Sequence, residues 1–194
     1  MKRSTLFLLA CLAGSFWWLW PTERPQAPQQ HSQTLANGGF RLARYSIYPL
    51  EDFSIEARVL GREDYRLGRE AELSPTDLAL GWGPMDDPRV LADIRITQGN
   101  RWFYWHADKL PIPRRELETH AANMHMIPAD ETVGAALRRV RRDQTVRIDG
   151  WLVQADAADG WRWRSSLTRE DSGGGACELV YVCRIATSAP AKTL

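Results

Sequence analysis

A thiol and two imidazoles are the side chains of this 194-residue chain whose chemistry could support nucleophilic catalysis. A cysteine becomes a nucleophile when a histidine takes its proton and a third group orients that histidine. His120 or His125 could serve as the base for Cys177, and Asn123 or Glu178 could orient the imidazole. No local signature of a thiol hydrolase surrounds Cys177. Hydrogen-bonding roles in loops are therefore the preferred interpretation of both histidines, with catalysis as the alternative.

Cys177 and Cys183 could instead pair with each other, because disulfides form in oxidising compartments. They are six residues apart, which is about 20 Å along a straight strand, whereas a disulfide needs Cα atoms within roughly 7 Å. Pairing requires that the glycine-rich loop at 173–176 folds Cys177 back, or that Cys183 bonds to another chain. The preferred interpretation is two small buried side chains, with a disulfide and a reactive thiol as alternatives.

Other kinds of catalytic or cofactor site are not predicted by the spacing of the polar residues. His120 and His125 lie five positions apart and share no helical face, and no Cys-x-x-Cys pair occurs, so no metal site is expected. Ser165-Ser166 lacks a Gly-x-Ser-x-Gly elbow. The run Gly173-Gly-Gly-Ala-Cys177 lacks the lysine and hydroxyl residue of a phosphate-binding loop. No cofactor is predicted.

Binding through aromatic and basic side chains is the other chemistry that the sequence offers. Trp161 and Trp163 alternate with Arg162 and Arg164, so a strand would place the tryptophans on one face and the arginines on the other. Stacking on single-stranded nucleic acid needs exposed rings beside cations, and the formal net charge of +1 also argues against a polyanion partner. We therefore expect the tryptophans to fill the core. The candidate binding residues are Trp105, Asn123, His125, Arg162 and Arg164.

The N-terminal segment predicts a membrane anchor. Lys2 and Arg3 precede an uncharged apolar run that ends in tryptophans before Pro21. Leading basic residues place the N-terminus in the cytoplasm, and terminal tryptophans suit the membrane–water interface. We expect residues 4–20 to contact lipid and the rest of the chain to face the periplasm, in a single-pass protein of the bacterial inner membrane. A cleavable secretory signal and a lipoprotein signal at Cys11 are the alternatives.

Composition divides the remainder of the chain. Proline and glutamine dominate the segment before Phe40, and such a composition stays extended and solvated. The apolar fraction of 44% and the charged fraction of 25% are those of an ordinary globular protein. The expected segments are a membrane anchor at 1–20, a spacer at 21–39, one periplasmic domain at 40–185 and a disordered tail at 186–194.

The first part of the domain predicts two strands followed by a helix. Apolar and polar residues alternate at 40–48 and 53–59, a period of two that is typical of half-buried strands. A turn is expected between them at 49–52. Ser74 is expected to cap a helix over 75–81, because a proline at the first helical position and an early aspartate follow it.

Short helices and strands alternate in the middle of the domain. We expect a helical turn after Asp87-Pro88 and a strand around Ile94 and Ile96. The aromatic strand at 101–106 is expected to be buried on both faces or packed against an aromatic groove. Helices are expected at 113–120 and 131–140. Asp130 can cap the last helix. Pro128 disfavours helix at the residue before it, so 121–127 is expected to be a loop or turn.

The C-terminal part predicts three further strands and sets the fold class. They are expected at 146–152, 161–167 and 178–185 in meander order, with a hairpin turn at Asp159-Gly160. Together with the earlier strands they predict an α+β fold that is mainly β. The expected architecture is a small antiparallel, partly open barrel of the OB or SH3 type with short packed helices.

Three sequence blocks carry a resemblance to a known group of proteins. They are Asn123-Met-His-Met-Ile-Pro-Ala129, Gly160-Trp-Arg-Trp-Arg-Ser-Ser-Leu167 and Gly175-Ala-Cys-Glu178. These blocks resemble an uncharacterised family of bacterial membrane-anchored proteins, and the likeness covers about residues 40–185. The resemblance implies that these residues form one domain of a membrane-anchored protein. It implies no activity.

The expected function is binding or assembly with another protein of the cell envelope. The anchor, the spacer and the lack of a recognisable active site support this interpretation. The alternative from a different class is a periplasmic enzyme that uses Cys177 with His125 or His120.

Overall fold

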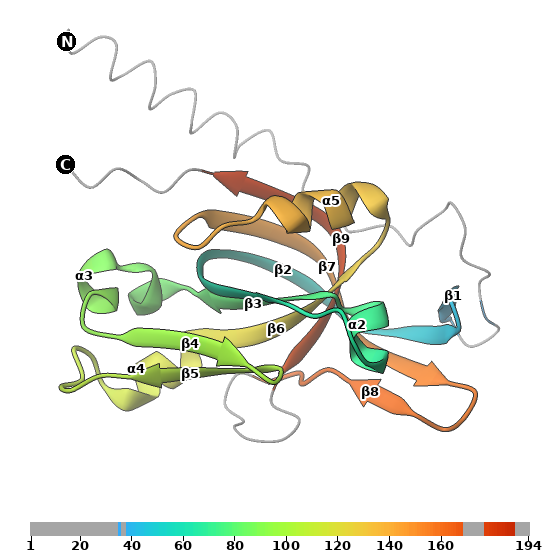
Figure 1. Ribbon diagram of the computed structural model, residues 1–194, viewed down its shortest axis with the longest axis horizontal. Helices are drawn as coiled ribbons and strands as arrows, with labels where there is room; N and C mark the ends of the chain where they lie inside the picture. The colour runs from blue at the N-terminus through green and yellow to red at the C-terminus, as the bar shows by residue number, and fades with distance from the viewer. Residues whose placement is uncertain (1–34, 36–37, 169–176, 189–194) are drawn as a thin grey trace, which may run out of the picture.

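A computed structural model describes residues 35, 38–168 and 177–188 of the chain (Figure 1). Within these residues the main sheet has seven strands and a separate hairpin has two. The strands of the main sheet are β1 (Phe40–Leu42), β2 (Tyr45–Asp64), β3 (Thr76–Gly81), β6 (Ala121–Pro128), β7 (Thr145–Ala157), β8 (Arg162–Arg164) and β9 (Glu178–Ser188). The hairpin consists of β4 (Arg95–Gly99) and β5 (Trp102–His106). The helices are α2 (Arg69–Leu73), the 3-10 helix η1 (Gly83–Asp86), α3 (Pro88–Leu91), α4 (Arg114–Thr119) and α5 (Glu131–Arg139).

Five strands of the main sheet each have a hydrogen-bonded neighbour on both sides. Their order is β2–β3–β6–β9–β7, and β7 pairs with β2 again. The pair β6–β9 is parallel, and the other four pairs are antiparallel. The predicted α+β fold, mainly β, is confirmed. The prediction that all pairs are antiparallel is wrong at β6–β9, where α5, β7 and β8 provide the long connection that a parallel pair requires.

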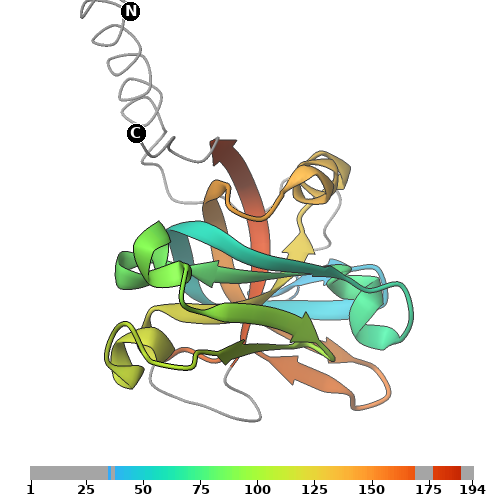
Figure 2. The same cartoon turned by 60° about the vertical axis from the view of Figure 1, so that its left-hand side comes forward.

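Alternation along these strands sends side chains to two buried faces. One apolar cluster receives residues from all five strands and from α5, including Val180 of β9. The neighbouring Tyr181 enters a second cluster with Phe40 and Trp151. On β3 the odd-numbered Ala79 packs in a third cluster with residues of the β4–β5 hairpin. The hairpin and α4 lie on one side of the molecule and α5 lies on the opposite side (Figures 1 and 2).

Three predicted helices are confirmed. α3 follows Asp87, and α4 begins at Arg114 after Pro113. α5 has Asp130 as its N-cap, whose carboxylate accepts a hydrogen bond of 2.8 Å from the backbone N–H of Val133. α3 and α5 have local caps, because the carboxylates of Asp87 and Asp130 accept hydrogen bonds from backbone N–H groups two and three residues further on.

The predicted helix at 75–81 is wrong, because this segment is strand β3. All six residues of β3 are buried, and the strand pairs with β2 on one side and β6 on the other. Ser74 follows the short helix α2 instead, and its N–H donates to the Glu70 carbonyl at 2.8 Å. Tertiary pairing on both edges here outweighs a local sequence pattern that suits a helix.

The predicted loop at 121–127 is also wrong, because this segment is most of strand β6. Pro128 is the last residue of that strand, and pairing resumes where the Ala129 N–H donates to the Val182 carbonyl at 3.0 Å. A residue before proline is driven away from helix and towards extended backbone. The proline therefore marked the end of a strand.

Two further boundaries differ from those predicted. No turn interrupts β2 at 49–52, because a β-bulge between Pro49 and Glu51 keeps the strand paired with β7. The turn lies earlier, where Ala43 adopts a left-handed φ of 51°. A bulge absorbs an extra residue without ending the strand.

The predicted meander at the C-terminal end is wrong, although its hairpin turn at Asp159-Gly160 is confirmed. β8 pairs with one edge of β7, whereas β9 pairs with the other edge of β7 and with β6. β8 is also shorter than the predicted 161–167, and β9 extends to Ser188.

The predicted anchor at 1–20, most of the spacer and the end of the tail lie outside the described residues. Each helix within the described part of the chain is too short or too polar to cross a bilayer.

Gly150 provides a test of the packing between β7 and β9. A Cβ atom at this position would lie 1.9 Å from the Tyr181 carbonyl oxygen, so Gly150→Ala must push these strands apart. Such overpacking costs about 1–3 kcal/mol, and we expect a corresponding fall in the free energy of unfolding from chemical denaturation. Gly99→Ala is the control, because its Cβ would meet no atom within 4 Å. Equal stability of the two variants would contradict the observed strand spacing.

Candidate functional site

The candidate site is a pocket at the place where the β4–β5 hairpin meets the main sheet. Its volume is about 260 Å³. The residues that line it are Glu70, Arg101, Trp102, His125, Trp163, Arg164 and Cys177. They come from α2, the hairpin, β6, β8 and the residue before β9. Five separate segments of the chain therefore meet at this pocket.

The buried carboxylate of Asp77 organises the wall behind the pocket. Its side chain has no solvent exposure. Arg101 Nη1 donates to Asp77 Oδ1 at 2.7 Å, and Asn123 Nδ2 donates to Asp77 Oδ2 at 3.1 Å. His125 Nδ1 lies 3.0 Å from Asp77 Oδ1. A buried carboxylate is tolerated when a cation and hydrogen-bond donors replace its lost water, and Arg101 and Asn123 do so here.

Arg101 also fixes the tip of the hairpin. Asn100 and Arg101 have φ angles of 53° and 69°, and two consecutive positive values are typical of a type I′ hairpin turn. Left-handed backbone is unfavourable for arginine. The Arg101 N–H donates to the Tyr65 hydroxyl at 2.9 Å, and the Arg101 carbonyl accepts from Asn123 Nδ2 at 3.0 Å. The guanidinium stacks 3.8 Å from the Tyr65 ring centre, so several contacts together hold this strained residue.

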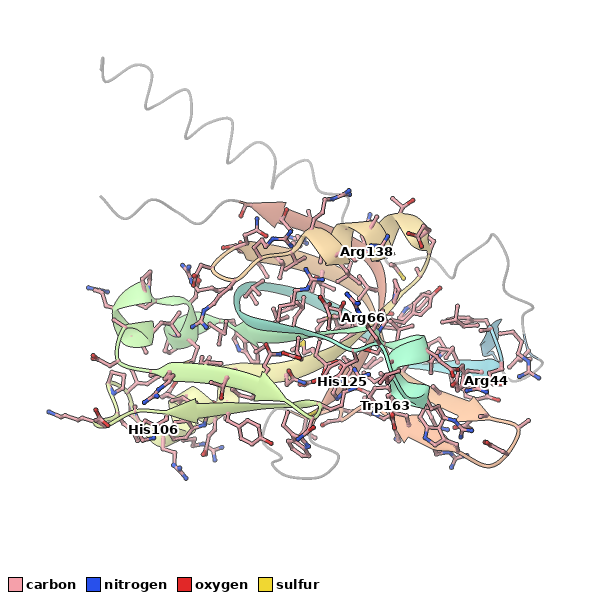
Figure 3. The ribbon with its side chains drawn as sticks, in the orientation of Figure 1. Arg44, Arg66, His106, His125, Arg138 and Trp163 are labelled. Carbon is pink, nitrogen blue, oxygen red and sulfur yellow. The ribbon has the colours of Figure 1, made fainter. Side chains whose placement is uncertain are left out.

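His125 lies between the buried carboxylate and an aromatic ring. Its side chain is 4% exposed, and its ring centre lies 4.8 Å from that of Trp163 (Figure 3). Although Nδ1 is close to Asp77 Oδ1, no hydrogen bond to Nδ1 has proper alignment within the described residues. The imidazole is thus held by packing, with a nearby carboxylate that can orient it.

Cys177 lies on the same pocket as His125. Its thiol is half-buried and reduced, and it donates a weak hydrogen bond to the Arg101 carbonyl at 3.9 Å. The structure therefore brings together two of the three predicted catalytic candidates. It does not bring in His120, whose Nδ1 lies 2.8 Å from the Glu116 carbonyl of α4 and whose ring packs beside Trp82.

Asn123, one of the two proposed orienting groups, makes its hydrogen bonds to residues other than His125. Asn123 contacts Asp77 and Arg101, and its Oδ1 accepts from Gln98 Nε2 at 2.8 Å. The group next to the His125 imidazole is Asp77. The sequence placed Asp77 at a helix N-terminus, and this wrong secondary structure hid its role in the site.

The predicted binding residues divide into three groups. His125 and Arg164 line the pocket, and Asn123 lies behind it. Arg162 pairs with Asp156 at 2.9 Å, outside the pocket. Trp105 lies under Arg114, whose guanidinium carbon is 5.0 Å from its ring centre.

The alternation in β8 is confirmed. Trp161 and Trp163 are half-buried against the core, whereas Arg162 and Arg164 are exposed. Trp163 nevertheless reaches the pocket as well, because the core beneath β8 opens onto it.

Cys183 behaves as a structural thiol. Cys183 and Cys177 are both half-buried, and neither is in a disulfide. Burial raises the pKa of the Cys183 thiol to about 12. The side chain is therefore protonated at neutral pH and is a poor nucleophile.

Within residues 35, 38–168 and 177–188, no three histidine, cysteine or acidic side chains gather as a metal site. Comparison of the chain with protein-family models, with curated proteins and with solved structures finds no match. The resemblance noted from the sequence blocks stays a prediction.

Sequence patterns did not identify Glu70, Arg101 or Trp102 as pocket residues. Glu70 was in an unassigned segment, and the aromatic run at 101–106 was expected to be buried. The turn signal Gly99-Asn100 could have indicated the position of Arg101, because it places this residue at the tip of a hairpin.

Replacing the buried carboxylate tests whether it organises this wall. Asp77→Asn keeps the shape but leaves the Arg101 charge uncompensated, and we expect a loss of about 3 kcal/mol in the free energy of unfolding. Amide hydrogen exchange should also accelerate in the hairpin. The control is Glu131→Gln, which breaks an exposed ion pair with Arg138 and should change stability little. A hairpin that exchanges no faster in Asp77→Asn would show that other contacts hold it.

Proposed function

We propose that this chain is a membrane-anchored protein of the bacterial inner membrane whose periplasmic domain binds a ligand or partner in the pocket beside β3 and β6. The observation that carries the proposal is the position of the pocket. In barrels of the OB type, ligands bind on the second and third strands, between the connections that follow the first and fourth strands. In this chain those strands are β3 and β6, and the flanking connections hold α2 and β8.

The order of the five strands supports an OB-like, partly open barrel. Each strand has two neighbours, with β2 as the first strand and β9 as the fifth. Glu70 lies in the connection after the first strand, and Trp163, Arg164 and Cys177 lie in the connection after the fourth. His125 comes from the third strand. The pocket therefore occupies the ligand-binding region of such a barrel.

The location of the domain follows from the N-terminal segment. In this proposal residues 4–20 lie in the lipid bilayer, 21–39 form the spacer, and the domain at 40–185 lies in the periplasm. The domain would act within an assembly of the cell envelope. An anchor confines the pocket to a layer near the membrane, which raises its effective concentration for partners there.

The chemistry of the pocket suits a ligand with both apolar and polar surface. Two indole rings, Trp102 and Trp163, provide flat apolar walls, and Arg164 and Glu70 provide charged hydrogen-bonding groups at the rim. Concave sites with apolar walls and a few convergent polar groups are typical of binding sites.

Photo-crosslinking in cells tests the binding proposal. A photoreactive phenylalanine analogue in place of Arg164 of the full chain should give discrete adducts on irradiation, because Arg164 is exposed at the pocket rim. The same analogue in place of Arg139, an exposed residue at the end of α5 that does not line the pocket, is the control. Adducts that are absent, or identical from both positions, would contradict ligand binding in this pocket.

A periplasmic thiol enzyme is the second candidate function. The observation that favours it is that Cys177 and His125 line one pocket with Asp77 behind the imidazole. Such an enzyme would need the imidazole to accept the thiol proton. The Cys177 thiol donates a weak hydrogen bond to the Arg101 carbonyl. Binding is the preferred function, because the pocket has apolar aromatic walls and polar groups at its rim.

Alkylation rates separate these two functions. We expect iodoacetamide to label both cysteines of the folded full chain slowly at pH 7 and rapidly after denaturation. Cys183 is the internal control, because its pKa of about 12 keeps it protonated in the folded state. Rapid labelling of Cys177 alone, with an acidic pH midpoint that His125→Gln abolishes, would favour the enzyme and overturn the preferred function.

A further inference from the structure

The β4–β5 hairpin exposes two aromatic rings on one face. Trp102 is 36% exposed and Tyr104 is 54% exposed. They lie two residues apart on β5, so they point to the same side at a spacing of about 7 Å. Phe103 and Trp105 point to the other side and pack on the third apolar cluster. The prediction that 101–106 is buried on both faces is therefore wrong, because the hairpin packs on the domain with only one of its faces.

The exposed face continues the pocket. Trp102 is part of the pocket wall. Tyr104 lines a second hollow of about 360 Å³ together with Arg95, Thr97, Trp105 and His106. Across the hairpin, Tyr104 pairs with Thr97 and His106 pairs with Arg95. His106 lies towards the far end of the hairpin from His125 and Trp163 (Figure 3). Trp102 of the first hollow and Tyr104 of the second are thus two residues apart on the same face of β5.

The charged side chains of this surface include an arginine at each of its two ends. Arg95 lies near one end, and within the described residues no carboxylate lies within ion-pair distance of it. Arg164 lies at the other end, where its contact is a hydrogen bond of 2.9 Å to the Gln154 side chain. Arg101 is neutralised by Asp77. Arg95 and Arg164 are therefore separated by the rings of Trp102 and Tyr104, and Arg114 lies over the Trp105 ring beside the second hollow.

We propose that the pocket and the Trp102–Tyr104 face together bind a glycan strand that carries occasional carboxylates. The proposal rests on the function assigned above to the pocket, and it names the class of ligand. The flat C–H faces of sugar rings pack on indole and phenol rings, and the Thr97 hydroxyl and the His106 imidazole can bond to sugar hydroxyls. OB-type barrels bind oligosaccharides with this part of the fold. The carboxylates pair with Arg95 and Arg164.

The spacing of the cations separates a glycan from single-stranded nucleic acid. A nucleic acid has one phosphate for every nucleotide, and its binding surfaces follow the backbone with a continuous row of lysine and arginine. Arg95 and Arg164 lie at opposite ends of the surface and form no such row. A net charge of +1 for the whole chain agrees with this conclusion.

Co-sedimentation with purified bacterial peptidoglycan, a glycan with peptide carboxylates, tests the proposal. The full chain in detergent micelles should sediment with this insoluble probe. Tyr104→Ala should weaken binding roughly three- to tenfold, as expected for the loss of one aromatic contact. Arg95→Ala should weaken binding to native probe, but not to probe whose carboxylates have been amidated. Leu67→Ala, which removes an apolar side chain that is 90% exposed elsewhere, is the matched control.

Three outcomes would overturn the glycan assignment. The first is that the protein does not sediment with the probe. The second is that Tyr104→Ala sediments as well as the unchanged protein. The third is that oligo(dT) displaces the protein from the probe at a concentration at which a cellulose-type polymer displaces none. Crosslinking from position 164 decides separately whether the pocket binds anything. Adducts there without sedimentation would refute the glycan and retain the binding function, and the absence of both would refute the binding function itself.

Discussion

The fully buried carboxylate of Asp77 is the constraint on which the rest of the site depends. It lies on β3, whose residues are all buried, so no water can solvate its charge. The surrounding chain must therefore supply a cation and donors, and it takes them from segments that are distant in sequence. Arg101 comes from the hairpin tip, and Asn123 comes from β6. A buried ion pair adds little net stability when compared with an apolar pair, but loss of one partner is costly. The Asp77 network therefore specifies where the hairpin docks more than it stabilises the domain.

This constraint explains why the hairpin has one packed face and one exposed face. Arg101 can reach Asp77 only if the hairpin tip lies against β3 and β6, and the Gln98 contact to Asn123 extends the same contact along β4. Ile96 and Trp105 then face the main sheet. Trp102 and Tyr104 must point away, because successive residues of a strand alternate. An aromatic surface next to a pocket thus follows from a single buried charge and the two-residue period of β5.

The sequence predicted those elements that depend on neighbouring residues. The cap at Asp130, the start of α4 after Pro113 and the turn at Asp159-Gly160 are local signals, and the structure contains all three. Ser74 and Pro75 gave an equally good local signal for a helix, yet β3 forms there because both of its edges are paired. Strand pairing with residues far along the chain cannot be predicted from a short segment of sequence. The same limit applied to the site: Cys177 and His125 were recognisable as chemical groups, whereas Asp77 became visible only when β3 was placed beside β6.

Binding and folding are coupled in this architecture through one residue. Arg101 lines the pocket, forms an ion pair with the buried carboxylate and has the strained backbone conformation of the hairpin turn. A change at Arg101 would alter the pocket, uncover a buried charge and release the turn at once, so its effect on binding could not be separated from its effect on folding. Arg164 and Tyr104 contact the same surface from exposed positions without any role in the Asp77 network. The chain therefore separates residues that build the surface from residues that meet a ligand, and the latter are the informative positions for functional work.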